Sequence, residues 1–249
     1  MPRASFRKAS VAPSQQPAEP GHQNLILMAL DANEHEVLAP HLEPVSLTSH
    51  LTLHEPGEPI EFGYFPKSGV ISLVVTVSDG KMVEVGIVGR EGFVGTPLAG
   101  GLTKTPHRAL VHVAGDGYRV RASVLHEVLP MAPKLRILLT RYALVQGMQL
   151  AQTAACNRLH GLEQRLARWL LMSQDRVNSN LLIMTHERFA TLLGTDRPSV
   201  SVVASWFQKR GIIEYKRGVV RVLSRRKLKE TACECYEVIQ EYYLQLGLK

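Results

Sequence analysis

The segment between Thr185 and Lys229 concentrates cationic and hydrogen-bonding side chains that can bind a polyanion. It holds eleven lysines and arginines against three acids, a local charge of +8 in a chain whose net charge is +7. Residues 30–130 instead hold twelve acids and seven bases. Because clustered lysine and arginine attract phosphate groups, this asymmetry indicates that one end of the chain meets nucleic acid.

Within this segment, residues 185–213 have the pattern of two helices joined by a tight turn. Thr185 and Asp196 are suited to be N-caps of the two helices, and Gly194 lies between them. The outward face of the second helix carries the candidate base-reading residues, which are Arg197, Ser199, Ser201 and Val202. An arginine can form paired hydrogen bonds with guanine, and a valine can contact a thymine methyl group. We therefore expect this face to enter a major groove.

Residues 213–222 follow as two short strands around a basic Lys-Arg-Gly tip, which is typical of a wing. The side chains assigned to phosphate contacts are Thr185, Lys209, Lys216 and Arg217. Phosphate contacts supply affinity and orientation, whereas base contacts supply specificity. The sequence thus predicts a winged helix-turn-helix domain over residues 159–249 that binds double-stranded DNA.

The preceding residues are expected to form three regions that carry this domain. Residues 1–21, rich in proline and polar residues, are expected to be a disordered tail. Residues 22–130 contain a short candidate helix at 24–38 and then many short β-rich runs, which favour an antiparallel β jelly roll. These runs are residues 51–54, 60–65, 70–77, 82–88, 109–113 and 118–121. The predicted fold class is therefore α+β.

Residues 131–158 are expected to form a long dimerisation helix. The 3-4 spacing of apolar and amide side chains predicts a coiled-coil seam formed by Leu135, Leu138, Tyr142, Val145 and Gln149. Ile137, Leu144 and Met148 add a second apolar surface, so the helix needs more than one partner. The alternative is an ordinary core helix with no role in dimerisation.

The order of β-rich region, long helix and winged helix-turn-helix resembles the Crp/Fnr family of bacterial transcription regulators over residues 24–229. The segments that carry the resemblance are residues 55–65, 92–95 and 193–200. The resemblance implies a jelly roll of the cyclic-nucleotide-binding type and a homodimer on a two-fold symmetric operator, with RNA polymerase as a further partner. It also implies that Arg197 corresponds to a base-reading arginine of the family.

The same resemblance locates a candidate effector pocket at Gly95, Thr96, His107 and Arg108. Family members that bind cyclic AMP have Gly-Glu-Leu beside the ribose and Arg-Ser or Arg-Thr at the phosphate. This chain has Gly95-Thr96-Pro97-Leu98 and His107-Arg108-Ala109 instead. Because the ribose-binding acid is missing, we expect an effector other than cyclic AMP and do not identify it.

The three cysteines, Cys156, Cys233 and Cys235, are too few for a disulfide framework. Zinc would need ligands beyond Cys233 and Cys235, and no adjacent residue supplies them, so we expect neither a metal site nor a cofactor. The free thiols and the lack of a membrane-spanning run indicate a cytoplasmic protein. No catalytic motif indicates an enzyme. The alternative function is a ligand- or redox-sensing module that acts through protein–protein contacts.

Overall fold

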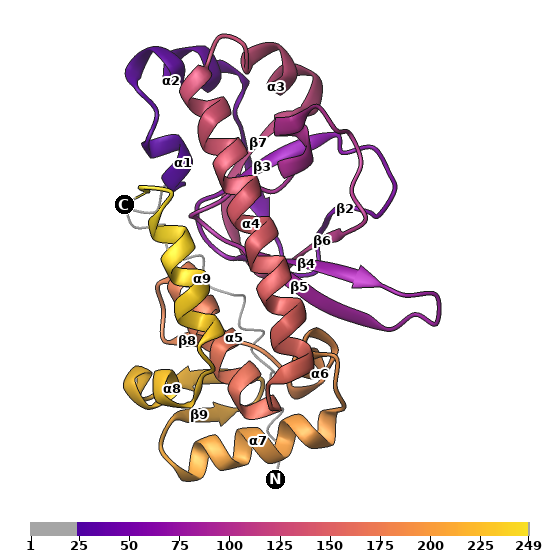
Figure 1. Cartoon of the computed structure of the whole chain (residues 1–249), viewed down its shortest axis with the longest axis vertical. Coiled ribbons are helices and arrows are strands. Elements are labelled where there is room, and N and C mark those ends of the chain that lie inside the picture. Colours follow the sequence, from indigo (N-terminus) through magenta and orange to yellow (C-terminus); the bar gives the residue numbers. More distant parts are fainter. Residues whose placement is uncertain (1–23, 249) are drawn as a thin grey trace, which may run out of the picture.

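The computed structural model describes residues 24–248, so the tail expected at residues 1–21 lies outside the described part of the chain. Figure 1 shows a β-rich half and a helical half, with the long helix α4 (Pro133–Leu159) running along both. This arrangement agrees with the mixed α+β architecture expected from the sequence. Within residues 24–248, no helix has the length and apolar character needed to cross a bilayer.

The β-rich half consists of two antiparallel sheets with strand orders β1-β7-β3 and β2-β6-β4-β5. Its strands are β1 (Glu43–Leu47), β2 (Thr52–His54), β3 (Phe62–Pro66), β4 (Val70–Thr76), β5 (Met82–Val88), β6 (Arg108–Val113) and β7 (Gly115–Arg121). The turn at residues 78–80 joins β4 to β5 as expected. Strand β1 was not expected, because it contains Pro44 and buries only Leu47 fully.

Short helices close the ends of this β-rich half, which is called the roll below. The single helix expected at residues 24–38 is instead two helices, α1 (Leu25–Met28) and α2 (Ala32–Leu38), because Asp31 caps the second one. A 3-10 turn, η1 (Ala39–His41), follows α2, while η2 (Thr96–Gly100) and α3 (Ala122–Val128) complete the region. The carboxylate of Glu34 in α2 accepts the backbone N–H groups of Lys134 and Leu135 at 2.7 and 2.8 Å. This contact fixes the start of α4 against the roll.

The expected dimer seam on α4 is wrong, because its five residues face the interior of their own subunit. Leu135, Leu138, Tyr142, Val145 and Gln149 are all buried in the single chain. They pack against the roll and the C-terminal helix, where Gln149 accepts a hydrogen bond from the Tyr243 hydroxyl at 2.7 Å. The exposed apolar positions are the other set, Ile137, Leu144 and Met148. Since α4 is apolar on two sides, its periodicity alone does not tell which side faces the roll.

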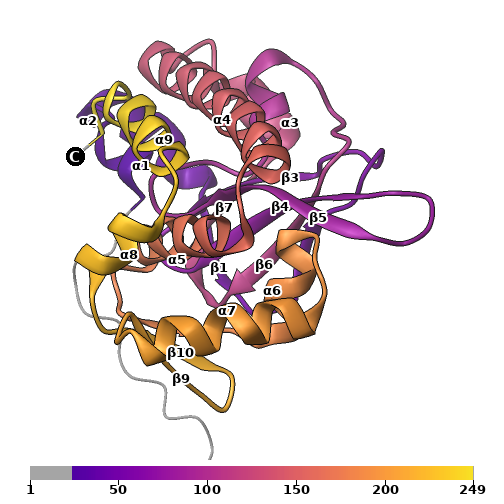
Figure 2. The ribbon, with the colours of Figure 1, turned by 60° about the horizontal axis from the view of Figure 1, so that its bottom comes forward.

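The helical half begins directly after α4. Its elements are α5 (Leu162–Val177), β8 (Leu181–Ile183), α6 (His186–Leu193), α7 (Arg197–Lys209), β9 (Ile213–Lys216), β10 (Val219–Val222), α8 (Arg225–Thr231) and α9 (Cys235–Leu244). The strands form one antiparallel sheet in the order β8-β10-β9. Trp169, Phe189 and Phe207 lie in its hydrophobic core. Helix α9 returns to lie beside α4, as both ribbon views show (Figures 1 and 2).

Buried polar contacts join the two halves. The Arg176 guanidinium of α5 pairs with Glu91 of the roll at 2.9 Å, and the Trp169 indole donates to Glu84 of β5 at 2.8 Å. Burial raises the pKa of Glu84 to about 7. His112 of β6 lies 2.9 Å from the Met184 sulfur, and burial lowers the pKa of this histidine to about 4. These contacts fix α5, and with it the helices that follow, against the roll.

Candidate nucleic-acid interface

Local capping builds the α6–α7 corner as the sequence predicts. The Thr185 hydroxyl accepts the Arg188 N–H at 3.3 Å, and the Asp196 carboxylate accepts the Ser199 N–H at 2.8 Å. Between the helices, Gly194 adopts a left-handed conformation with φ of 59°, which favours glycine. The corner therefore holds α7 at a defined angle to α6 without a long loop.

One face of α7 packs into the core and the other faces solvent. The buried stripe is Val200, Val203, Ala204 and Phe207, which recur at the spacing of one helix face. Arg197 is exposed at the first turn, and the Val202 side chain is 70% exposed in the middle of the helix. Ser205, which the sequence analysis did not single out, is exposed on the same side. Figure 2 shows α7 at the front of the molecule with the β9–β10 hairpin beside it.

Ser199 and Ser201 differ from the other expected base-reading residues because their hydroxyls already have partners. Ser199 donates to the Asp196 carboxylate at 2.8 Å. The Ser201 hydroxyl donates to the Arg197 carbonyl at 3.0 Å and lies 2.9 Å from Nδ1 of His186. Both serines are half-buried. These hydroxyls position the start of α7 rather than projecting freely from it.

The wing is a tight two-residue hairpin with a cationic tip. Lys216 pairs with Val219 across it, and Arg217 and Gly218 both have positive φ values of 50° and 78°. Such values match the turn type that suits the twist of a β-hairpin. Lys216 and Arg217 are exposed, and the Thr185 side chain lies beside Gly218. Of the four assigned phosphate contacts, Lys216 and Arg217 thus share the tip, and Thr185 lies beside it.

The basic residues of this region divide into paired and unpaired groups. Arg221, Arg225, Arg226 and Lys229 pair with acids at 2.6–3.9 Å. Among residues 24–248, by contrast, no carboxylate lies within ion-pair distance of the other seven, which are Arg188, Arg197, Lys209, Arg210, Lys216, Arg217 and Lys227. Three of these seven contact other groups: Arg188 contacts His50, Arg210 lies over the Trp206 ring, and Lys227 donates to the Arg210 carbonyl. The four that remain, called the unpaired cations below, are Arg197, Lys209, Lys216 and Arg217 on α7 and at the wing tip, so positive charge is left available around this surface.

His186, the first residue of α6, connects α7 to the wing and was missed from the sequence. Its ring stacks on Tyr215 of β9 with centroids 4.1 Å apart, while its Nδ1 faces the Ser201 hydroxyl at 2.9 Å. Burial, with a contribution from Arg197, lowers the pKa of His186. Only the three-dimensional arrangement brings these residues together, since 29 positions separate His186 from Tyr215.

The polar side chains of the candidate effector residues are already bonded to neighbouring side chains. Arg108 pairs with Glu55 at 2.7 Å, and the adjacent His107 lies 3.1 Å from the Thr105 hydroxyl. Thr96 instead donates to Gln146 of α4 at 2.7 Å, and Gly95 precedes it with φ of 110°. Glu55 thus neutralises the arginine that would bind an anionic effector.

The expectation that no further metal ligand lies near Cys233 and Cys235 is wrong. Cys156 of the last turn of α4 and His160, which caps the end of that helix, lie next to the two cysteines. The ligand atoms of the four residues are all within 4.8 Å of one another. Sequence reasoning missed this group because more than seventy residues separate its two halves along the chain.

Comparisons with known proteins agree with the fold and the corner. The family model of the Crp-like helix-turn-helix domain matches residues 164–231. Among curated proteins, none matches the sequence of this chain.

The structural matches to solved proteins of the same fold cover nearly the whole length of those proteins. They include a putative transcriptional regulator of the Crp/Fnr family from Eubacterium rectale, 14% identical, covering 83% of this chain and 96% of that one, with a TM-score of 0.64. FixK2 from Bradyrhizobium japonicum is 16% identical, with coverages of 77% and 98% and a TM-score of 0.65. The c-di-GMP responsive global regulator CLP from Xanthomonas campestris is 17% identical, with coverages of 78% and 100% and a TM-score of 0.63. Residues 164–231 are therefore a Crp-like helix-turn-helix domain, carried by a chain with the fold of the Crp/Fnr transcription regulators.

Proposed function

We propose that this chain regulates transcription by binding double-stranded DNA, with α7 in the major groove and the wing tip on the phosphate backbone. The observation that carries the proposal is the group of unpaired cations around the exposed face of α7, described above. Four neighbouring basic residues pair with acids of their own chain, and three others contact His50, the Trp206 ring or a backbone carbonyl, so the charge left for a polyanion is concentrated at this surface. Contact with RNA polymerase stays an expectation from the family resemblance.

We assign base reading to Arg197 and Val202, and phosphate contacts to Thr185, Lys209, Lys216 and Arg217. Arg197 extends from the first turn of α7, the part of a recognition helix that contacts base edges. Ser199 and Ser201 support this turn through the hydroxyl contacts given above. Ser205 adds a free polar group one helical turn beyond Val202.

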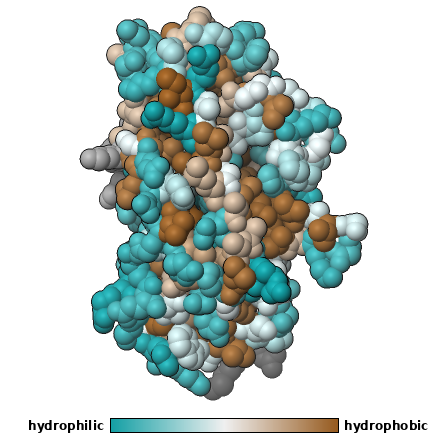
Figure 3. All heavy atoms as spheres, in the orientation of Figure 1, coloured by the Kyte–Doolittle hydropathy of each residue, from teal (hydrophilic) through white to brown (hydrophobic). Residues whose placement is uncertain are grey.

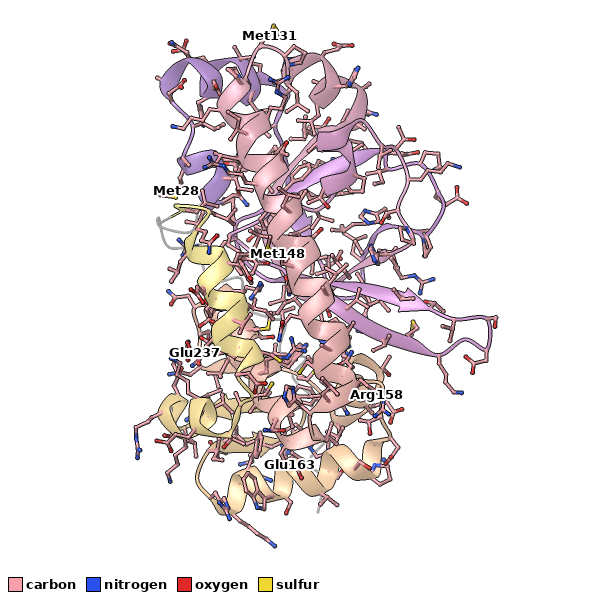
Figure 4. All side chains as sticks on the ribbon, in the orientation of Figure 1. Met28, Met131, Met148, Arg158, Glu163 and Glu237 are labelled. Atoms are coloured by element: carbon pink, nitrogen blue, oxygen red, sulfur yellow. The ribbon has the colours of Figure 1, made fainter. Side chains whose placement is uncertain are left out.

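We further propose that the protein acts as a homodimer through the exposed stripe of α4. Ile137, Leu144 and Met148 are 50%, 61% and 44% exposed, unusual for large apolar side chains on one helix face. Figure 3 shows hydrophobic atoms running down the middle of this face, and Met148 lies on the exposed front of α4 in Figure 4. Ile137 and Leu144 are seven residues apart, the repeat of a coiled coil. A second copy would bury this stripe and duplicate α7 by two-fold symmetry.

Selection of bound fragments from a random DNA pool tests the DNA proposal. The expected product is a two-fold symmetric site whose half-sites are centred about 10 base pairs, or a multiple of this, apart. Affinity for that site should fall steeply as salt concentration rises, because phosphate contacts release counterions. Recovery of no sequence above the random background would reject sequence-specific binding.

Sedimentation of charge-insertion variants tests the dimer separately. Leu144→Asp should shift the protein toward monomer, because it places a carboxylate in the proposed seam. Leu223→Asp is the matched control, since Leu223 is comparably exposed but lies beyond the wing. A dimer that tolerates Leu144→Asp as well as Leu223→Asp would show that the seam lies elsewhere.

A further inference from the structure

Four metal-ligand side chains from distant parts of the chain converge where α4 ends. Cys156 lies in the last turn of α4, and His160 is the C-cap residue that directly follows this helix. Cys233 and Cys235 lie on the short connection from α8 to the start of α9. Figure 4 shows sulfur atoms in the space between α9 and the lower part of α4.

Two of the distances between the donor atoms match those around one tetrahedral ion, and all four donor atoms lie within 4.8 Å of one another. The sulfurs of Cys156 and Cys233 are 3.5 Å apart, and the Cys235 sulfur is 3.5 Å from Nδ1 of His160. Zinc bonds of about 2.3 Å to sulfur and 2.0–2.1 Å to nitrogen hold tetrahedral ligand atoms roughly 3.5–3.8 Å apart. A disulfide needs about 2.05 Å between sulfurs, so the cysteines are not placed as a formed disulfide.

The surroundings of the cluster are those of a built site. All three cysteines are buried, and His160 is half-buried. While Nδ1 of His160 faces the sulfurs, its Nε2 lies 3.2 Å from the Glu234 carboxylate. The Gln152 amide donates to the Cys235 sulfur at 3.1 Å. A carboxylate on the far nitrogen of a ligating histidine fixes the ring orientation and its tautomer, as in many zinc sites.

A buried cation offsets the charge that such a site would carry. Three thiolates, a neutral imidazole and a divalent ion leave a net charge of −1. Arg168 of α5 is buried and close enough to Cys156 to interact with its charge. Its Nη1 donates to the Thr153 hydroxyl at 3.2 Å, but its Nε has no hydrogen-bond partner among the described residues. Because no carboxylate of the described residues lies within ion-pair distance of Arg168, a negatively charged metal centre would add compensating charge.

We propose that Cys156, His160, Cys233 and Cys235 bind one Zn²⁺ ion in a tetrahedral site. Thiolate and imidazole donors favour zinc over magnesium or calcium, which prefer oxygen. The four protein ligands fill the coordination shell, which is typical of a structural site rather than a catalytic one.

The position of the site gives the ion a mechanical role. His160 and Gly161 form the joint between α4 and α5, and Cys233 follows α8, the first helix after the wing. Zinc would therefore hold the joint between α4 and α5 against the connection between α8 and α9. Loss of the ion would free this joint and loosen the orientation of α7 relative to α4. This regulatory consequence, unlike the site itself, rests on the proposed DNA binding.

Metal analysis of the full-length protein, purified without chelators, tests the site without using DNA. We expect one zinc per chain, retained through gel filtration. Replacement by Co²⁺ should produce the visible bands of tetrahedral cobalt together with sulfur-to-metal charge-transfer absorption. Reaction of the three thiols with a thiol reagent should be slow until a chelator removes the metal.

Single substitutions then assign the ligands. His160→Gln should weaken zinc binding by more than about 100-fold, since even an outer-shell partner is worth roughly 10- to 100-fold. Glu234→Gln should weaken it within that smaller range. His126→Gln is the matched control, because His126 is an exposed histidine of α3 remote from the cluster in sequence, and it should bind zinc like the wild type. Circular dichroism checks that each variant is folded.

The proposal is overturned if the folded wild-type protein binds no zinc, or if cobalt gives no thiolate charge-transfer band. A Cys156–Cys233 disulfide found by mass spectrometry in protein that never binds metal would also overturn it, in favour of a redox pair. If zinc binds as expected but chelation leaves affinity for the selected DNA unchanged, the regulatory role is rejected and the site stands. If no DNA is selected at all, only the proposed function fails.

Discussion

Two regions of the molecule use arginine in opposite ways. At the junction between the roll and α5, Arg176 is buried and paired with Glu91 at 2.9 Å. On α7 and the wing tip, Arg197 and Arg217 are exposed, and no carboxylate of residues 24–248 lies within ion-pair distance of them. A buried guanidinium must be compensated within the protein, whereas an exposed one keeps its charge for a partner. The charge that a surface offers to a polyanion therefore depends less on its number of basic residues than on how many of them lack an internal partner.

The largest expected effect concerns the junction. Arg176→Ala should lower the free energy of unfolding by about 3–5 kcal/mol, because it leaves Glu91 without its buried partner. Arg226→Ala removes an exposed pair with Glu230, both side chains more than half exposed, and should cost no more than about 0.5 kcal/mol. Denaturant unfolding of both variants measures the contrast. Similar small losses would show that burial does not distinguish the two pairs.

Acid should weaken the same junction through His112. Burial lowers the pKa of this histidine from 6.5 to about 4, so the folded protein holds it neutral while the unfolded chain protonates near 6.5. Its stabilisation is complete above pH 6.5 and is lost as pH falls to about 4, up to roughly 3 kcal/mol at 1.36 kcal/mol per pKa unit.

Denaturant unfolding as a function of pH measures this effect. His112→Gln should remove much of the loss between pH 6.5 and 4, whereas exposed His126→Gln should not change it. Glu84, whose raised pKa makes it stabilising below pH 4.5 and less so as pH rises through 7, contributes equally to both variants. Parallel pH curves for the two variants would refute the role of His112.

The unpaired cations of the wing should contribute to the salt dependence of DNA binding. Lys216→Ala should reduce the slope of log affinity against log salt by about 1 and weaken binding similarly on all sequences. Lys229→Ala should change the slope less, because Lys229 already pairs with Glu237 at 2.9 Å. Fluorescence anisotropy over a salt series provides the measurement. Equal slopes for the two variants would contradict the division into paired and unpaired cations.

The smallest effect is expected in the roll, at Arg108. Arg108→Ala should destabilise the protein by no more than about 1 kcal/mol, since its pair with Glu55 is partly exposed. Cyclic AMP should not change DNA affinity in the wild type or in this variant, because Glu55 already neutralises the arginine. Calorimetric titration of cyclic AMP checks this directly, and tight binding abolished by Arg108→Ala would show that the pair opens for the nucleotide.

The helix-turn-helix could be predicted because its signals are local. Thr185, Gly194 and Asp196 specify caps and a turn within a few residues, and the structure has α6 and α7 where these residues place them. The face of α4 could not be predicted, because both of its sides are apolar and only the packed roll decides which one is buried. Leu135 and Tyr142 therefore proved to be core residues, while Leu144 stayed exposed.

The Cys156–His160–Cys233–Cys235 group shows a different limit of sequence reasoning. Each half has a spacing that suits a metal site, but neither half is sufficient alone. The return of α9 along α4 brings the halves together, and no local pattern specifies that path. His186 and Tyr215 similarly become neighbours only through the fold of the corner and the wing.

We propose that Arg197 reads a base from the first turn of α7 while the wing supplies unspecific affinity. Position-by-position binding to single-base variants of the selected site, measured for Arg197→Ala and Lys216→Ala, tests it most directly. Arg197→Ala should lose about 1–3 kcal/mol of discrimination at one position of each half-site, whereas Lys216→Ala should keep the full preference at lower affinity. An unchanged base preference in Arg197→Ala would contradict it.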